Sequence, residues 1–194
     1  MVKQFMYKEG RRDNSHIGMK VALRLKLLEY FDNPTVLDVY GGFGAMHRHV
    51  WQKYNYVATE EDALQWLQNN DLRYEIYDVD PYGSPYEALK LINEKISKEK
   101  FAIACTDGAL RRQALMRSPT IPKIVIDLLH DMDFTNKRTR PYIYYNYPVV
   151  LRLLISRIFP NYEIKKLYLK YGNRNIWASA TCYFSCLLSR NRVQ

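Results

Sequence analysis

The sequence has few cysteines and histidines and lacks long apolar runs. Its 194 residues include three cysteines and four histidines, too few for a disulfide framework or for a zinc site built from thiolates alone. We therefore expect free thiols and no metal ion. There is no run of about 18 uncharged apolar residues, and the first residues show no apolar signal-peptide segment. These absences predict a cytoplasmic protein without a membrane span.

Acidic residues are outnumbered by basic ones. With 29 Lys and Arg against 20 Asp and Glu, the formal net charge is +9, which attracts polyanions such as nucleic acid. A solubilising basic surface explains the same charge equally well. The 17 tyrosines favour nucleic acid slightly, because aromatic faces beside basic groups stack on unpaired bases. The length and the 47% hydrophobic content predict one folded domain over residues 1–194.

Short β-rich runs alternate with helical patterns in the first half of the chain. The predicted strands are 35–40, 56–59, 72–79 and 101–105, and the predicted helices are 17–31, 45–54, 63–70 and 86–98. This alternation is typical of an α/β fold, a mostly parallel sheet with helices on both faces. In such folds ligands bind at the carboxyl ends of the strands.

The first predicted helix is amphipathic. Its apolar face is expected to consist of Ile17, Val21, Leu25 and Leu28. Its basic residues, Lys20, Arg24 and Lys26, are expected to lie largely elsewhere.

The second half of the chain has a weaker pattern. Residues 111–140 carry seven Arg or Lys and an irregular apolar pattern, which indicates an insertion. A helix at 149–159 and two strands at 163–171 and 176–188 follow, and the turn at 172–175 predicts that these strands form an antiparallel hairpin. A parallel sheet finished by such a hairpin is the layout of Rossmann-like methyltransferases.

A glycine-rich turn follows the first predicted strand. Glycines let the backbone approach a ligand, and the next helix begins with unpaired N–H groups. The turn has Tyr40 where the usual D-x-G-x-G-x-G pattern has its first glycine, but it keeps Gly42 and Gly44. We predict that a nucleotide-like cofactor is contacted by Asp38, Tyr40, Gly42 and Gly44, with a purely structural turn as the alternative.

Acidic residues close the second predicted strand. A carboxylate there can hold a ribose diol through two charge-assisted hydrogen bonds, and Glu60 follows Asp38 by about one βα unit. We assign Glu60 to the ribose and leave Asp62 as a helix cap or an adenine contact. Alternatively, Glu60, Glu61 and Asp62 all cap the next helix.

The segment DVDPYGSP at 78–85 is the most informative of the sequence. Its two prolines and glycine predict a loop at 80–85. It resembles the D-P-F-G-S-P loop of the tRNA guanine-N2 dimethyltransferases, a variant of the Asp/Asn-Pro-Pro-Tyr loop of amine methyltransferases. Three further segments resemble that family in the right order. They are Arg12-Asp13 with Ser15 (N-R-D-x-S), Cys105-Thr106-Asp107 (T-x-T-D) and Val150-Leu151-Arg152-Leu153-Leu154 (A-L-R-hydrophobic-L).

The resemblance implies an S-adenosylmethionine-dependent methyltransferase of an exocyclic amine on a nucleic-acid base, most closely guanine N2 in a tRNA-like RNA. The lone pair of such an amine is delocalised, so the enzyme must hold its N–H groups while the nitrogen pyramidalises. Asp80 and the carbonyl of Pro81 are expected to accept those hydrogens, and Tyr82 to stack on a flipped base. Arg12 and Asp80 are also assigned to the cofactor, and the chemistry requires no metal.

The chain departs from this family at one place in the sheet. Only about 20 residues separate Glu60 from Asp80, so we expect that one βα unit is missing, at an edge of the sheet. Alternatively, residues 60–63 are the third-strand motif and the ribose-binding unit is lost. The sequence also has no counterpart of the C-terminal domain that the family uses with its tRNA.

Basic residues of the irregular region are predicted to contact nucleic-acid phosphates, with a solvated basic face as the alternative. They are Arg111, Arg112, Arg117, Lys123, Lys137, Arg138 and Arg140.

Two other functions stay open at the level of the sequence. One is a DNA adenine-N6 or cytosine-N4 methyltransferase, whose loop usually has consecutive prolines where this chain has Pro81-Tyr82. The other is a non-catalytic module that keeps the fold to bind nucleic acid or a partner. The intact Asp80, Pro81 and Tyr82 favour an enzyme.

Overall fold

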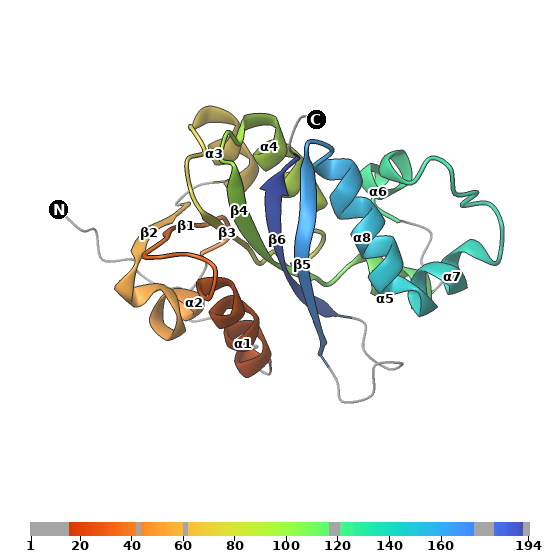
Figure 1. Ribbon diagram of the computed structural model, residues 1–194. Helices are drawn as coiled ribbons and strands as arrows, with labels where there is room; N and C mark the ends of the chain where they lie inside the picture. Colours follow the sequence, from red (N-terminus) through yellow and green to blue (C-terminus); the bar gives the residue numbers. More distant parts are fainter. Residues whose placement is uncertain (1–15, 42–43, 60–61, 117–120, 173–180, 192–194) are drawn as a thin grey trace.

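The computed structural model describes residues 16–41, 44–59, 62–116, 121–172 and 181–191. They contain a six-stranded sheet of order β2-β1-β3-β4-β6-β5 (Figure 1). The strands β1 (Thr35–Asp38), β2 (Asn55–Ala58), β3 (Ile76–Val79) and β4 (Lys100–Asp107) are parallel. The last strand, β6 (Cys182–Arg190), is antiparallel to both β4 and β5 (Tyr162–Tyr171). The mostly parallel sheet with a C-terminal antiparallel pair is thus confirmed.

Helices cover both faces of the sheet. One face carries α1 (Ile17–Leu28), α2 (Ala45–His49) and the 3-10 turn η1 (Trp51–Lys53), and the other carries α3 (Ala63–Asn69), α4 (Tyr86–Lys95) and α8 (Tyr147–Ile158) (Figure 1). Because side chains alternate along a strand, Ile76 packs with the α1 face and Tyr77 with the α8 face. All four residues of β3 are buried, as expected for a strand covered on both sides.

The irregular region forms three short helices between β4 and α8. These are α5 (Leu110–Met116), α6 (Lys123–Leu128) and α7 (Thr139–Tyr145), and they lie beside α8 (Figure 1). Their buried residues Val125 and Ile143 join the core on the α8 face. Helices of six or seven residues are too short for a helical period to stand out in the sequence.

The predicted apolar face of α1 is confirmed at Ile17, Val21 and Leu28, which pack against the core. It is wrong at Leu25, which is 49% exposed. Arg24, expected away from this face, is buried because its guanidinium forms an ion pair inside the protein with Asp78.

Several predicted boundaries also differ from those observed. The strand predicted at 101–105 extends to Asp107, because β6 pairs with β4 as far as that residue. The third strand begins at Ile76 instead of residue 72. Strand β2 is the edge strand next to β1, as expected if the missing βα unit belonged to that edge. Among the described residues, no helix is long and apolar enough to cross a membrane.

Candidate active site at the carboxyl edge of the sheet

The carboxyl ends of β2, β1 and β3 meet at one edge of the sheet. Asp38 and Asp78 are register partners at the ends of β1 and β3. Beyond them, the Val39 N–H donates to the Asp78 carbonyl at 2.8 Å, and the Thr59 N–H donates to the Asp38 carbonyl at 3.1 Å. The predicted cofactor residues that the structure describes follow these strand ends, so the fold brings together the turns that the sequence singled out.

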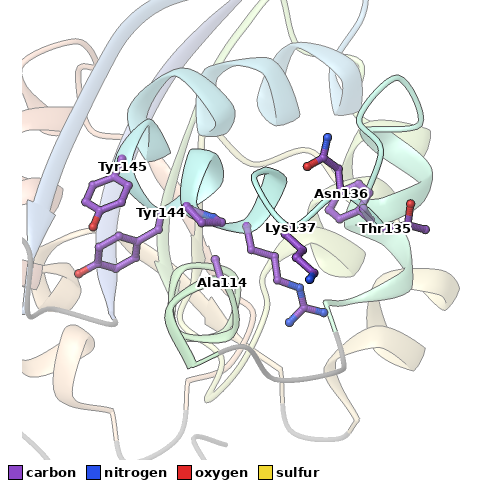
Figure 2. Close-up of a pocket in the computed structure, with 9 residues that line it drawn as sticks. Ala114, Thr135, Asn136, Lys137, Tyr144 and Tyr145 are labelled. Carbon is purple, nitrogen blue, oxygen red and sulfur yellow. The ribbon is translucent and has the colours of Figure 1, made fainter.

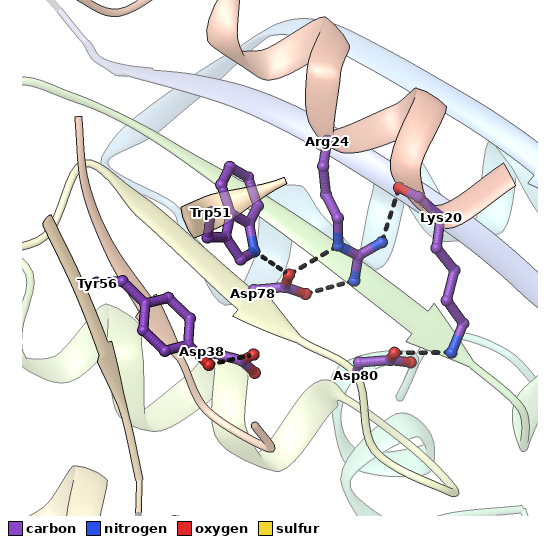
Figure 3. A network of polar contacts seen from close by, with 7 residues as sticks. All are labelled: Lys20, Arg24, Asp38, Trp51, Tyr56, Asp78 and Asp80. Atoms are coloured by element: carbon purple, nitrogen blue, oxygen red, sulfur yellow. Dashed lines mark hydrogen bonds and ion pairs between the residues drawn. The ribbon is translucent and has the colours of Figure 1, made fainter. Parts of the chain in front are cut away.

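A buried ion pair lies directly beneath this edge (Figure 3). The Asp78 carboxylate accepts hydrogen bonds from Arg24 Nε at 2.7 Å and from Trp51 Nε1 at 2.8 Å, and its second oxygen pairs with Arg24 Nη2. Arg24 and Asp78 are both 0% exposed. Burial lowers the pKa of Arg24, but the charge and hydrogen bonds of Asp78 more than offset this and raise it above its ordinary value. Charges buried in this way are tolerated because they are paired.

Asp80 continues the same row, two residues after Asp78. Its Oδ2 accepts a hydrogen bond from Lys20 Nζ of α1 at 2.7 Å, and its side chain is 18% exposed (Figure 3). Burial raises the pKa of Asp80, but the positive charges of Arg24 and Lys20 outweigh burial and lower it below its ordinary value. Asp80 is therefore an ionised acceptor at neutral pH that keeps some access to the surroundings.

Asp38 differs electrostatically from Asp80. It is 3% exposed, and its Oδ2 accepts a hydrogen bond from the Tyr56 hydroxyl at 3.0 Å. Burial and then the nearby charge of Asp78 raise the pKa of Asp38 well above its ordinary value, against the opposing effects of Tyr56 and Arg24. A cationic ligand beside Asp38 would favour its ionised form.

At two described positions of the turn after β1, the backbone geometry explains why the residue is glycine. A Cβ on Gly41 would lie 2.8 Å from the Cβ of Ala58, so this residue lets the turn pass close to β2. Gly44 has φ of 64° and precedes α2, a left-handed conformation that glycine adopts without strain. Tyr40 is half-buried beside this turn. Gly42 lies outside the described residues.

Asp62 acts as a helix cap. Its Oδ1 accepts hydrogen bonds from the N–H groups of Leu64 and Gln65 at 3.0 Å, at the start of α3. Of the two roles left open for Asp62, the structure supports the cap. Glu60 and Arg12 lie outside the described residues, so their assignments stay predictions.

The loop at 80–85 presents an aromatic ring at this edge. The Tyr82 side chain is 100% exposed, and the loop is tied to the end of β4 by a 3.0 Å hydrogen bond from the Gly108 N–H to the Gly83 carbonyl. Helix α4 is capped at Pro85 without a side-chain hydrogen bond. Asp80 therefore does not cap α4, which was the structural alternative for this carboxylate.

The predicted nucleic-acid residues separate into two groups. Lys137 and Arg138 are exposed at the start of α7, and Arg140 is half-buried on that helix. Arg111 is 2% exposed and lies between the rings of Tyr144 and Tyr171, 4.4 and 4.5 Å from their centroids. This environment favours a packing role for Arg111. Arg117 and the side chain of Arg112 are not among the described parts.

Sequence reasoning missed Lys20, Arg24 and Asp78. The signal for Asp78 was its place in DVDP: residues 76, 78 and 80 point to one side of a strand, so Asp78 and Asp80 had to face the same helix. Nothing local in α1 identified Lys20 and Arg24 as their partners, because the pairs span 60 and 54 residues.

Comparison with known proteins supports the fold. No protein-family model and no curated protein matches this sequence. Among solved structures, a protein described as a candidate methyltransferase, YhhF from Escherichia coli, matches with a TM-score of 0.52 and 13% identity, over 95% of this chain and 90% of that chain. Trm1 from Pyrococcus horikoshii, solved with S-adenosylmethionine, matches with a TM-score of 0.52 and 13% identity, over 92% of this chain. This chain spans 55% of the length of that Trm1 chain. These likenesses confirm the predicted Rossmann-like methyltransferase fold.

Proposed function

We propose that this chain is an S-adenosylmethionine-dependent methyltransferase that acts on an exocyclic amine of an RNA base, guanine N2 being the favoured target. The observation that carries the proposal is the state of Asp80. Its carboxylate is held ionised by Lys20 and Arg24 at the carboxyl end of β3, and the exposed ring of Tyr82 follows two residues later. This combination provides a hydrogen-bond acceptor and a stacking surface on one short loop.

The residues at the sheet edge fit the proposed cofactor. S-adenosylmethionine carries a sulfonium and an ammonium group, and Asp38 supplies a buried carboxylate whose ionisation a cation would favour. Gly41 and Gly44 keep the turn after β1 compact, and Tyr40 is half-buried beside it. We assign Asp38, Tyr40 and Gly44 to the cofactor, with Glu60 as the predicted ribose ligand. When bound, the cofactor would supply the methyl group.

The loop would act by positioning the target amine. Asp80 and the carbonyl of Pro81 would accept the amine hydrogens, which favours a pyramidal nitrogen with an available lone pair. Tyr82 stacks on the base once it has left its helix. Lys20 holds the Asp80 carboxylate in place and keeps it ionised. The carboxylate then stabilises the positive charge that develops on the nitrogen in the transition state.

The charge of the molecule supports a nucleic-acid substrate. The net charge of +9 attracts phosphates, and Lys137 and Arg138 are exposed just before α7. The Pro81-Tyr82 pair favours guanine as the target base, because DNA adenine-N6 and cytosine-N4 methyltransferases usually have consecutive prolines at this place.

The proposal is tested by nucleoside mass spectrometry. The protein is incubated with methyl-labelled S-adenosylmethionine and, in parallel, with unmodified RNA and DNA, and the digested nucleosides are analysed for label. Labelled N2-methylguanosine from the RNA is the expected result. Label on adenine N6 or cytosine N4 from DNA would replace the favoured substrate with the alternative one. Label in neither polymer, under conditions where the cofactor is bound, would contradict the proposal for a nucleic-acid substrate.

A further inference from the structure

The structure also contains a pocket whose lining includes none of Asp38, Asp78 and Asp80. It has a volume of about 630 Å³ and lies between α5 and α7, where its lining includes Ala114, Phe134, Lys137, Arg140, Tyr144 and Tyr145. Figure 2 shows Tyr144 and Tyr145 on one side, Thr135 and Asn136 on the other, and Ala114 of α5 between them. Its volume is within the range of pockets that hold small ligands, about 300–1,000 Å³.

The lining combines aromatic rings with positive charge. Tyr145 is 61% exposed, so much of this residue is accessible to solvent. It packs edge-on against the buried Tyr144, with ring centroids 5.2 Å apart, which fixes its orientation. The exposed Lys137 and the half-buried Arg140 add positive charge. An aromatic platform next to cationic side chains is the combination that binds single-stranded nucleic acid.

The acidic side chain nearest in sequence does not line this pocket. Residues 133–145 contain a single carboxylate, Asp133. Its Oδ1 accepts a 2.9 Å hydrogen bond from the Thr135 N–H and a 2.5 Å hydrogen bond from the Thr135 hydroxyl, so its charge is directed into its own loop. Among the described residues that line the pocket there is no Asp or Glu, whereas Lys137 and Arg140 are both present.

Helix α5 connects this pocket to the loop at 80–85. The helix starts at Leu110, whose N–H donates to Asp107 at the end of β4, and the neighbouring Gly108 N–H donates to Gly83 of the loop. Ala114, on the same helix, lines the pocket and α5 packs against α7. A seven-residue helix is about 10 Å long. Helix α5 therefore joins the pocket to the end of β4 that contacts this loop.

We propose that the α5–α7 pocket binds one nucleotide of single-stranded RNA that flanks the target nucleotide, with its base stacked on Tyr145 and its phosphate held by Lys137 and Arg140. This inference rests on the proposed function, because it assigns the pocket to the same RNA substrate. A stacking ring requires an unpaired base, so the site discriminates against duplex RNA, whose base faces are covered. The pocket would anchor the strand while the neighbouring nucleotide reaches the loop.

The test is fluorescence anisotropy with a labelled single-stranded RNA of about 12 nucleotides, without cofactor. Loss of base stacking should make Tyr145→Ala bind about tenfold more weakly, whereas Tyr145→Phe, which keeps the ring, should bind like the wild type. Lys137→Ala should reduce the slope of log affinity against log salt by about 0.7, the value for one phosphate contact on a single strand. Lys165→Ala is the matched control, because it removes the same charge from β5, where Lys165 pairs with Glu163.

The result that would overturn this inference is equal RNA affinity of Tyr145→Ala and the wild type, with unchanged thermal unfolding. Tighter binding of duplex RNA, or of an acidic peptide, than of single-stranded RNA would also overturn it. The failure of the proposed function would look different, because it would appear as absent cofactor binding or absent methyl transfer, neither of which this assay measures. Retained cofactor binding in Tyr145→Ala would show that the effect is confined to RNA.

Discussion

Two carboxylates follow neighbouring strands of the sheet, and their surroundings differ. Asp107 ends β4 and is 0% exposed. Its Oδ2 accepts hydrogen bonds from the hydroxyls of Tyr86 and Tyr147, both at 2.7 Å, and its Oδ1 accepts the N–H groups of Ala109 and Leu110 at 3.0 and 2.9 Å. This carboxylate joins β4 to α4, α5 and α8, so its acceptor capacity is used by the fold itself.

Asp80 follows β3 and keeps acceptor capacity for a ligand. It forms an ion pair with Lys20, is 18% exposed and belongs to a loop that carries the exposed Tyr82. The comparison teaches that an aspartate at the carboxyl edge of this sheet can serve structure or chemistry, and that the number of donors from the chain separates the two roles. Substitutions of the two aspartates should therefore have different consequences.

The largest effect is expected for Asp107→Ala. The change leaves the hydroxyls of Tyr86 and Tyr147 and two N–H groups buried without their acceptor, and should lower the free energy of unfolding by about 3–5 kcal/mol. Urea denaturation measures this loss in the free energy of unfolding. The control Asp127→Ala removes an exposed carboxylate paired with Lys123 on α6 and should change stability by less than about 0.5 kcal/mol. Similar stabilities of the two variants would contradict the structural role.

Asp80→Ala should have the opposite profile. Methyl transfer should fall by about 10²-fold or more, the scale of losing one preorganised electrostatic contact in the transition state. Cofactor affinity should change little, because Asp80 acts mainly on the amine. Single-turnover rates with labelled cofactor, together with calorimetry, separate the two effects. An unfolded protein would show that the Asp80 carboxylate is structural, and a rate equal to that of the wild type would show that it takes no part in methyl transfer.

Lys20→Met should shift the pH dependence of the reaction. Burial raises the pKa of Asp80, and the charges of Arg24 and Lys20 lower it, so removal of Lys20 raises it. Because the carboxylate acts when ionised, the acidic limb of the rate profile should move to higher pH, with less than about tenfold loss on the alkaline side. The control is Lys26→Met, which removes the exposed partner of Glu29 from the same helix. An unmoved acidic limb in Lys20→Met would refute this role.

The smallest effect is expected for Asp38→Asn. Burial and the charge of Asp78 raise the pKa of Asp38 in the folded protein, so the folded state binds a proton that the unfolded chain has already released. Stability from this group is therefore complete below about pH 4, the pKa of an unfolded aspartate, and falls as the pH rises towards the raised pKa. Asp38→Asn should remove at least about 1 kcal/mol of the stability difference between pH 5 and pH 8. Equal urea midpoint shifts in both proteins would contradict the raised pKa.

The sequence predicted the sheet and its hairpin because these elements depend on local patterns. The strands β1, β3 and β4 are short apolar runs bounded by turn residues, and a strand covered on both faces needs nothing more to be recognised. The helices α5, α6 and α7 were read as irregular because six or seven residues hold fewer than two turns. The burial of Arg24 on α1 was not predicted, because a buried arginine follows from its tertiary partner, Asp78, and not from its own helix.

The candidate site was predicted as a set of loops but not as an electrostatic arrangement. The motif at 78–85 identified Asp80, Pro81 and Tyr82, since proline and glycine mark a loop and the resemblance supplies its role. The pairing of Asp80 with Lys20 depends on how α1 lies across the sheet, which residue spacing alone does not specify. Asp107 shows the same limit, because its tyrosine partners come from α4 and α8.

Isothermal titration calorimetry with S-adenosylmethionine tests whether the carboxyl edge of the sheet holds the cofactor. We expect that the wild-type protein binds the cofactor, and that affinity increases from pH 6 to pH 8, because a cation beside Asp38 favours the ionised carboxylate whose pKa the fold raises. Asp38→Asn should weaken binding and flatten this pH dependence, while Asp80→Ala should bind nearly as the wild type. Absence of binding at millimolar cofactor would contradict the account and leave the chain as a non-catalytic module on a methyltransferase fold.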